Sequence, residues 1–158
     1  MATRKIRTLG DPVLEKISKP VSETNEKIKE LIYDMLDTMY IANGVGLAAP
    51  QVGVLKRIVV IDVSPEGDEP IVLINPEIIA ASGSQTGDEG CLSVPGKAGC
   101  VTRPNEVTVR ALDLQMKEIE LTGTELLARA LCHEIDHLNG IVYVGKVEGE
   151  LHEVATEA

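Results

Sequence analysis

The sequence contains no phenylalanine and no tryptophan, and only three tyrosines among its 158 residues. Ile, Leu, Val, Ala and Met must therefore build the core. With a hydrophobic content of 44%, they are numerous enough for a chain of this size to fold without covalent crosslinks. The length predicts one domain over residues 1–158, because neither a repeat nor a linker divides the chain.

Basic residues and long apolar runs are also scarce. Fifteen Lys and Arg against 25 Asp and Glu give a net charge of −10, which argues against direct binding of nucleic acid. We interpret the acidity as a source of solubility. No apolar run approaches the length of a membrane span, and the N-terminal residues show no signal-peptide pattern. We therefore expect a cytoplasmic protein without a membrane partner.

The chain has only three cysteines, which are Cys91, Cys100 and Cys132. An odd number in a chain without a signal peptide does not indicate a disulfide framework. In the reducing cytoplasm these thiols would be available for metal binding or catalysis.

The spacing of apolar residues predicts two long helices. Residues 25–42 carry apolar side chains three and four positions apart, and Asn43-Gly44 ends that helix. A second helix is predicted over 124–138, opened by Thr122-Gly-Thr and ended by Asn139-Gly140. Asp11 is the expected N-cap of a short helix over 12–17.

Strands are predicted between the two long helices and after the second one. Asn75-Pro76 is expected to separate two of them, and Pro95 to end any strand around it. The predicted strands are 55–63, 70–74, 77–81, 107–112, 115–121 and 141–144. The order of helix, strands and helix predicts an α+β fold with mainly antiparallel pairing.

The strongest chemical signal is His133-Glu134-Ile135-Asp136-His137 in the second long helix. Residues four apart lie on one face of a helix, so His133 and His137 can bind one metal ion. Glu134 lies beside them, near enough to take a proton from water on that ion without being a ligand. Two ordinary helix histidines are the alternative, but the chain has only three histidines and two have this spacing.

A catalytic metal ion needs a third protein ligand and an open fourth position. Cys91, in Glu-Gly-Cys-Leu-Ser, is one candidate. Cys132 points about 100° away from His133 around the helix, so we interpret it as packing, and Cys100 as a small hydrophobe. The other candidates are the carboxylates after the helix, Glu148, Glu150 and Glu153. The residues alone leave this choice open.

A third segment, Gly44-Val-Gly-Leu-Ala-Ala-Pro-Gln51, is rich in small residues that let a backbone approach a ligand closely. The Gln51 amide can donate to an oxygen of that ligand. The segment is not a phosphate-binding loop, because no Gly-Lys-Ser/Thr follows it, but alone it could be any glycine-rich turn.

Together these segments resemble the peptide deformylase family. Its pattern is Gly-x-Gly-Leu-Ala-Ala-x-Gln, Glu-Gly-Cys-Leu-Ser and His-Glu-x-x-His, present here at 44–51, 89–93 and 133–137. The start of the chain, at 6–14, is also similar, and the resemblance covers roughly residues 3 to 145. It implies an α+β fold with mainly antiparallel sheets packed around a central helix carrying the HExxH motif.

The resemblance also implies the site. The expected metal ligands are Cys91, His133 and His137, holding one divalent ion, Fe(II) first, with zinc, nickel or cobalt as substitutes. Glu134 would be the general base, while Gln51 and the Leu92 N–H would bind the carbonyl oxygen. The residues expected to bind the substrate and its methionine side chain are Val45, Gly46, Leu126, Ala130 and the stem of Arg129.

The implied reaction removes the formyl group from the N-terminal formylmethionine of nascent polypeptides and releases formate. A general zinc peptidase would instead take its third ligand after the helix. A non-catalytic metal domain would have a closed four-ligand site. The Glu-Gly-Cys-Leu-Ser segment disfavours the first alternative, and Glu134 disfavours the second.

Two points stay open at this stage. Many family members carry a basic C-terminal helix that docks on the ribosome, but residues 148–158 are short and acidic. Docking through a basic tail is therefore in doubt. Glu89, Arg103 and Asp136 either orient the ligands from a second layer or are surface charges.

Overall fold

The structure is a computed structural model, and it describes residues 2–154. Within these residues the chain forms two α-helices, eight strands and three short 3-10 turns. In chain order they are η1 (Pro12–Glu15), α1 (Glu26–Ile41), β1 (Gly46–Ala48), η2 (Ala49–Val52), β2 (Ile58–Ile61), β3 (Ile71–Ser82), β4 (Gln85–Cys91), β5 (Val94–Arg103), β6 (Glu106–Leu112), β7 (Glu118–Thr124), α2 (Leu126–Leu138), η3 (Tyr143–Lys146) and β8 (Glu148–Glu153).

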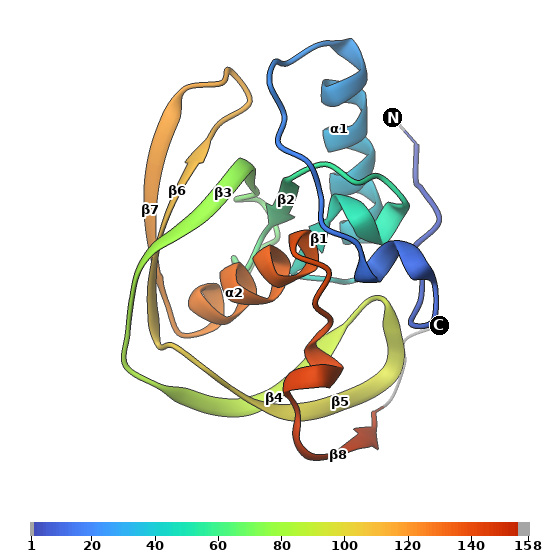
Figure 1. Cartoon of the computed structure of the whole chain (residues 1–158), viewed down its shortest axis with the longest axis vertical. Coiled ribbons are helices and arrows are strands. Elements are labelled where there is room, and N and C mark those ends of the chain that lie inside the picture. Colours follow the sequence, from blue (N-terminus) through green and yellow to red (C-terminus); the bar gives the residue numbers. More distant parts are fainter. Residues whose placement is uncertain (1, 155–158) are drawn as a thin grey trace.

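The strands form two antiparallel sheets. The larger sheet has the order β1-β2-β3-β6-β7 and the smaller one the order β4-β5-β8. Helix α2 contacts strands of both sheets, and Figure 1 shows it between the β3-β6-β7 side of the molecule and the smaller sheet. The predicted α+β class is confirmed, with the HExxH motif on this enclosed helix.

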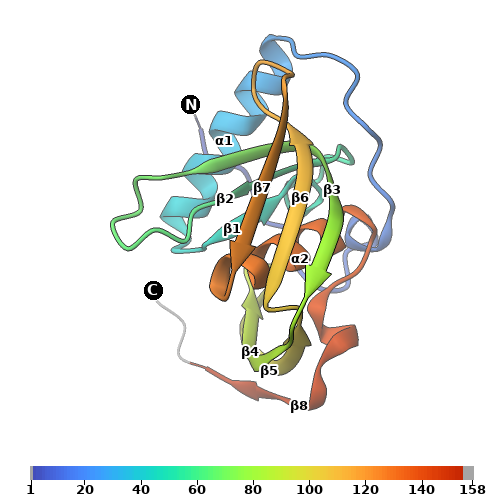
Figure 2. The same ribbon diagram turned by 90° about the vertical axis from the view of Figure 1, so that its left-hand side faces the viewer.

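The strand β2, which lies between β1 and β3, shows how the core is divided between the two helices. Its four residues are fully buried, and successive side chains of a strand point to opposite faces of the sheet. Ile58 and Val60 pack in the cluster that contains the apolar face of α1, whereas Val59 and Ile61 pack with α2. In Figure 2 the strands β3, β6 and β7 cross in front of α2.

Helix α2 has one face for the core and one for the site. The residues that pack against the larger sheet recur three and four positions apart and are Ala128, Leu131, Ile135 and Leu138. His133 and His137 lie one turn apart on the other face, and both are buried. None of the helices in the described part of the chain is long and apolar enough to span a membrane.

The predicted bounds of α1 and the predicted N-cap of η1 are confirmed. The Asn25 side chain accepts a hydrogen bond from the Ile28 N–H at 2.9 Å, so Asn25 is the N-cap of α1. The chain leaves α1 at Asn43, whose φ of 58° is left-handed. Asp11 likewise accepts from the Val13 N–H and caps η1, which ends at Glu15, two residues earlier than predicted.

The prediction that Asn75-Pro76 separates two strands is wrong, because β3 continues through this pair. Asn75 has a φ of 53°, and its side chain exchanges two hydrogen bonds with the backbone of Val21, both of 2.8 Å. The register of β3 against β6 shifts between Ile74 and Glu77. A bulge thus accommodates the proline, which has no N–H to give to the ladder.

Four further predictions in the second half of the chain are also wrong. Thr124 ends β7 instead of opening the second helix, and Glu125, with a φ of 55°, turns the chain into α2. The predicted strand over 141–144 overlaps the 3-10 turn η3 instead. The last strand is β8, in the acidic segment where none was predicted, and Pro95 lies inside β5 instead of ending a strand.

Candidate metal centre

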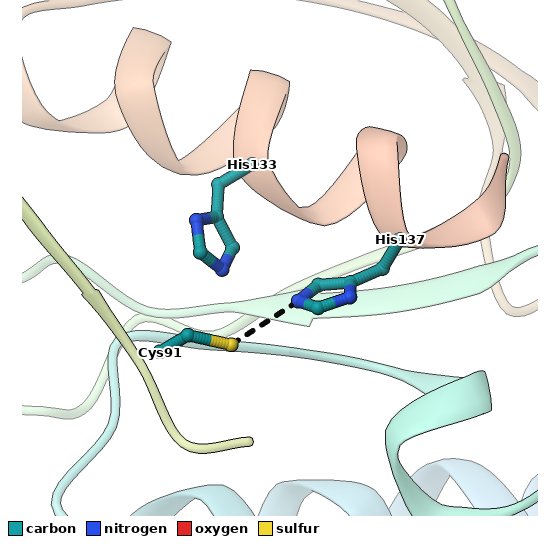
Figure 3. A group of neighbouring side chains, drawn as sticks. All are labelled: Cys91, His133 and His137. Atoms are coloured by element: carbon teal, nitrogen blue, oxygen red, sulfur yellow. Dashed lines mark hydrogen bonds between the residues drawn. The ribbon is translucent and has the colours of Figure 1, made fainter. Parts of the chain in front are cut away.

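Three side chains predicted to bind metal converge in the structure. The ligand atoms of Cys91, His133 and His137 all lie within 4.8 Å of one another. Figure 3 shows the two imidazoles on α2 facing the thiol of Cys91, whose Sγ lies 3.3 Å from His137 Nε2. Among the described residues this is the one such group of His, Cys, Asp and Glu donors. The downstream glutamates lie on the exposed strand β8, apart from this group.

A buried carboxylate fixes the orientation of His133. The Nδ1 of His133 donates to Glu89 Oε2 at 2.6 Å, which leaves Nε2 as the nitrogen that a metal ion can take once it has lost its proton. Glu89 also accepts hydrogen bonds from Arg103 and Arg129. Burial would raise the pKa of Glu89, but the hydrogen bonds from His133 and Arg103 outweigh it and lower the pKa to about 2. Glu89 is therefore ionised.

The three residues left open by the sequence form one network. Arg103 donates to Glu89 Oε2 and to Asp136 Oδ2, each at 2.7 Å, and Lys146 lies 3.2 Å from the same Asp136 oxygen. Glu89 and Arg103 are buried, so neither is a surface charge. Arg129, of which only the stem was expected to act, donates to Glu89 Oε1 at 2.9 Å. Through Glu89, these charged residues fix the orientation of the His133 ring at its Nδ1.

His137 is suited to bind as a neutral ligand. It is 1% exposed, and its burial, together with the nearby charge of His133, lowers its pKa to about 3. Within the described part of the chain its Nδ1 has no hydrogen-bond partner, while its Nε2 faces Cys91. An imidazole that stays neutral keeps the lone pair that a metal ion requires.

Glu134 lies next to the three donors and is 4% exposed. Burial raises its pKa to about 7, although the neighbouring His133 opposes this shift. Its Oε2 lies 4.0 Å from His133 Nε2, and its Oε1 has no hydrogen-bond partner among the described residues. A carboxyl group that titrates near neutrality can both accept and return a proton.

The Gln51 amide is oriented by hydrogen bonds on both ends. Its Oε1 accepts from the Ala48 N–H at 2.9 Å, and its Nε2 donates to Ser93 Oγ at 3.0 Å. The same Nε2 lies 3.5 Å from Cys91 Sγ, so the donor end of the amide faces the metal donors. Ser93, which no sequence pattern marked as a site residue, is fully buried.

The residues expected to bind substrate line one cavity with two of the three metal donors, Cys91 and His133. The cavity measures about 520 Å³, and His133, Glu134, Cys91 and Gln51 line it. The predicted residues that also line it are Val45, Gly46, Leu92, Leu126, Arg129 and Ala130. Val45 and Leu126 are half-exposed and lie at its rim, whereas Ala130 and Arg129 are buried. Gly96, Lys97 and Val154, absent from the prediction, complete the wall.

A family model described as polypeptide deformylase matches residues 3–152. The chain belongs to the peptide deformylase family. The peptide deformylase of Lachnoclostridium phytofermentans is 69% identical over 156 residues, covering 99% of this chain and 96% of that protein. The peptide deformylase of Agathobacter rectalis is 66% identical over 157 residues, and the match covers 99% of this chain and 98% of that protein.

Solved deformylase structures agree with the fold. The crystal structure of the Legionella pneumophila enzyme has a TM-score of 0.90 at 52% identity, covering 93% of this chain and 87% of that one. An Ehrlichia chaffeensis enzyme in complex with actinonin has a TM-score of 0.90 at 39% identity, with coverages of 94% and 90%. This deformylase is therefore a hydrolase that removes the N-formyl group from nascent peptides, in a metal-dependent family.

Proposed function

We propose that Cys91, His133 and His137 hold the divalent ion of this deformylase and that Fe(II) is that ion in the cell. The convergence of three donors beside the buried Glu134 carries the assignment. The donor set fits: His133 offers Nε2, His137 stays neutral, and a thiolate completes a mixed N/S site. Zinc, nickel or cobalt would occupy the same donors as substitutes.

The ion, when bound, supplies a Lewis acid that polarises the formyl carbonyl and acidifies the attacking water. Glu134 accepts the proton of that water at its carboxylate and returns it to the leaving amine, a role for which a pKa of about 7 is suited. Gln51 Nε2 and the Leu92 N–H donate to the oxygen that becomes negative in the transition state. The products are formate and a free amino terminus.

The cavity holds the methionine side chain of the substrate. Val45, Gly46, Leu126 and Ala130 provide an apolar lining, and the Arg129 stem adds to it while Glu89 binds the guanidinium. We infer that residues 1–158 act as a single catalytic domain in the cytoplasm, on chains emerging from ribosomes. The described end of the chain is an exposed strand with three glutamates, so it offers no basic docking helix.

We expect the wall at Gly44 and Gly46 to make formyl a better substrate than larger acyl groups. A Cβ at Gly46 would lie 2.5 Å from Glu134 Oε2, and one at Gly44 would lie 2.6 Å from Leu92 Cδ1. The backbone therefore contacts the base and the cavity lining directly. The added methyl of an acetyl group would displace the reacting carbon, and a misplacement of about 1 Å costs around 10²-fold in rate.

The decisive test compares kcat/KM for formyl-Met, acetyl-Met and formyl-Ala peptides by following release of the acid. Formyl-Met should be hydrolysed at least about 10²-fold faster than acetyl-Met. Replacing methionine by alanine in the formylated peptide should lower kcat/KM by about 10–200-fold at most. Equal rates on formyl and acetyl substrates would refute the tight-site argument. Cleavage of internal peptide bonds would indicate a general peptidase, and no turnover by metal-loaded protein would indicate a binding domain.

Metal analysis tests the identity of the ion separately. Protein purified without oxygen should contain about one equivalent of iron, and activity should fall on exposure to air as the half-buried thiol of Cys91 oxidises. Zinc as the main metal under those conditions would overturn the choice of Fe(II) and leave the three-ligand assignment standing.

A further inference from the structure

Strand β8 lies at the edge of the smaller sheet, next to β5 (Figure 1). It pairs antiparallel with β5, with Lys97 opposite Glu153 and Ala98 opposite His152. All six of its residues are exposed. Leu151, which is 37% exposed, packs partly over Gly99, but a strand whose side chains are all exposed contributes little hydrophobic free energy, so core packing does not explain its position.

Side-chain and backbone contacts fasten β8 to the β4-β5 hairpin, which also carries Cys91. Lys97 Nζ lies 3.2 Å from Glu153 Oε1, and His152 Nε2 lies 3.2 Å from Asp88 Oδ2. Just after the strand, the Val154 N–H donates to the Gly96 carbonyl at 3.0 Å. These contacts bring the end of β8 to the site cavity.

Val154, Gly96 and Lys97 line the same cavity as His133 and Glu134. Val154 and Lys97 are half-exposed, so they form the rim of the cavity. His133 and Glu134 are buried and form its floor. A peptide with its formyl group on the floor must extend outwards, and its following residues pass the rim.

We propose that β8 is a specificity element of this deformylase, in which Val154 and the Lys97–Glu153 pair contact the residues that follow formylmethionine. The proposal rests on the proposed function. Val154 and the neighbouring Pro95 offer apolar surface to an apolar side chain of the substrate, and the ion pair holds that surface in place. Formylated peptides of three or more residues, with an apolar third residue, are the substrates that gain from this contact.

The experiment compares formyl-Met amide, which ends at the floor, with formyl-Met-Ala-Leu amide, which reaches the rim. Val154→Asp should raise KM for the longer substrate, relative to KM for the shorter one, by about 3–10-fold, because the leucine loses apolar contact. Ile17→Asp is the matched control, since Ile17 is 71% exposed and does not line the cavity. It should leave the KM ratio at the wild-type value.

Equal changes of KM on both substrates, or a lower melting temperature with an unchanged ratio, would show that β8 is only a structural strap. Either result overturns the proposal. Failure of the wild-type protein to hydrolyse either substrate would instead contradict the proposed function, so the two failures are distinguishable.

A charge exchange tests the ion pair. Lys97→Glu and Glu153→Lys should each raise KM for the longer substrate by up to about 5-fold, the range expected for an exposed pair. The double exchange Lys97→Glu/Glu153→Lys should restore most of the loss. A double variant no better than the worse single variant would show that this pair does not hold the rim.

Discussion

The two sides of the metal centre differ in charge. On the α2 side, His133 is held by the ionised Glu89, which Arg103 and Arg129 hold in turn. On the β1 side, Gln51 is held by the Ala48 N–H and the Ser93 hydroxyl, both neutral. In the proposed mechanism, buried charges would therefore orient a metal ligand, whereas neutral dipoles would face the substrate carbonyl.

Physical chemistry explains this division. A ligand imidazole donating to an ionised carboxylate is a stronger ligand with a fixed ring orientation, so charge is useful behind His133. An oxygen that becomes negative only in the transition state is best stabilised by neutral donors already in position. The following predictions test whether the two sides control metal binding and turnover separately.

Removal of the Cys91 thiol should have the largest effect. Cys91→Ala should lose most of its bound metal, and with it nearly all activity, because two imidazoles alone hold the ion weakly. Cys132→Ala is the control, since Cys132 is buried in the core cluster of α2 and should keep its metal. Metal content by mass spectrometry decides, and full occupancy in Cys91→Ala would contradict the three-ligand assignment.

Glu134→Gln should lower kcat by about 10²–10⁴-fold and leave the metal content at the wild-type level. The amide has nearly the same shape as the carboxylate but cannot accept a proton from water. If metal and activity were lost in equal proportion, Glu134 would be a ligand and not the base.

Gln51→Ala tests the neutral side. Loss of one donor to the developing oxyanion should lower kcat by about 10²–10³-fold. Metal content should not change, because the Nε2–Cys91 Sγ distance of 3.5 Å is that of a weak contact. A variant that lost metal more than turnover would mean that Gln51 supports the ligand and not the substrate.

Glu89→Gln tests the charged side. Its metal affinity should fall about 10–100-fold, the usual cost of losing a partner of a ligand histidine. The residual activity at saturating metal should exceed that of Glu134→Gln. Metal titration followed by activity separates the two quantities, and an unchanged metal affinity would contradict the role of the buried charge.

The smallest effect is expected far from both sides, at Asp34. This buried carboxylate accepts from the Ala2 N–H and from Arg4 Nε, each at 2.9 Å, and these bonds lower its pKa. The resulting stability is complete above the unfolded pKa of about 3.9 and is lost as pH falls through the lower folded pKa. Asp34→Asn should lower Tm by about 2–4 °C at pH 7.

Thermal unfolding of Asp34→Asn and wild type at a series of pH values checks this sign. The difference in Tm should be constant from pH 7 to pH 5 and should shrink below about pH 4. A difference that grew on acidification would show that the carboxylate is not stabilised in its ionised form.

The sequence predicted the parts of the fold and site that depend on local spacing. Both long helices follow from apolar periodicity and from the Asn-Gly pairs that end them, and His133 and His137 share a face because they are four residues apart. The choice of Cys91 over the later glutamates came from the family resemblance, because no local rule relates residue 91 to residue 133.

The parts that sequence did not predict depend on pairing between distant segments. β4 and β5 are rich in glycine and lack a clear alternation of apolar residues, so their ladder is formed by contacts that no short window contains. The bulge at Asn75 was missed for the same reason, since its partner Val21 lies 54 residues away. Glu89 and Arg103 could be assigned to the site only after that ladder placed them behind His133.

The glycine wall beside Glu134 also limits how this chain can change. Any side chain at Gly46 would take the space of the Glu134 carboxylate, and any at Gly44 would take that of Leu92. A molecule that binds by hydrogen bonds to this stretch of backbone therefore meets a surface that substitution can reshape only by sacrificing activity. Resistance to such a molecule would have to arise at exposed rim positions, such as Val45 and Leu126, where side chains can vary without touching the base.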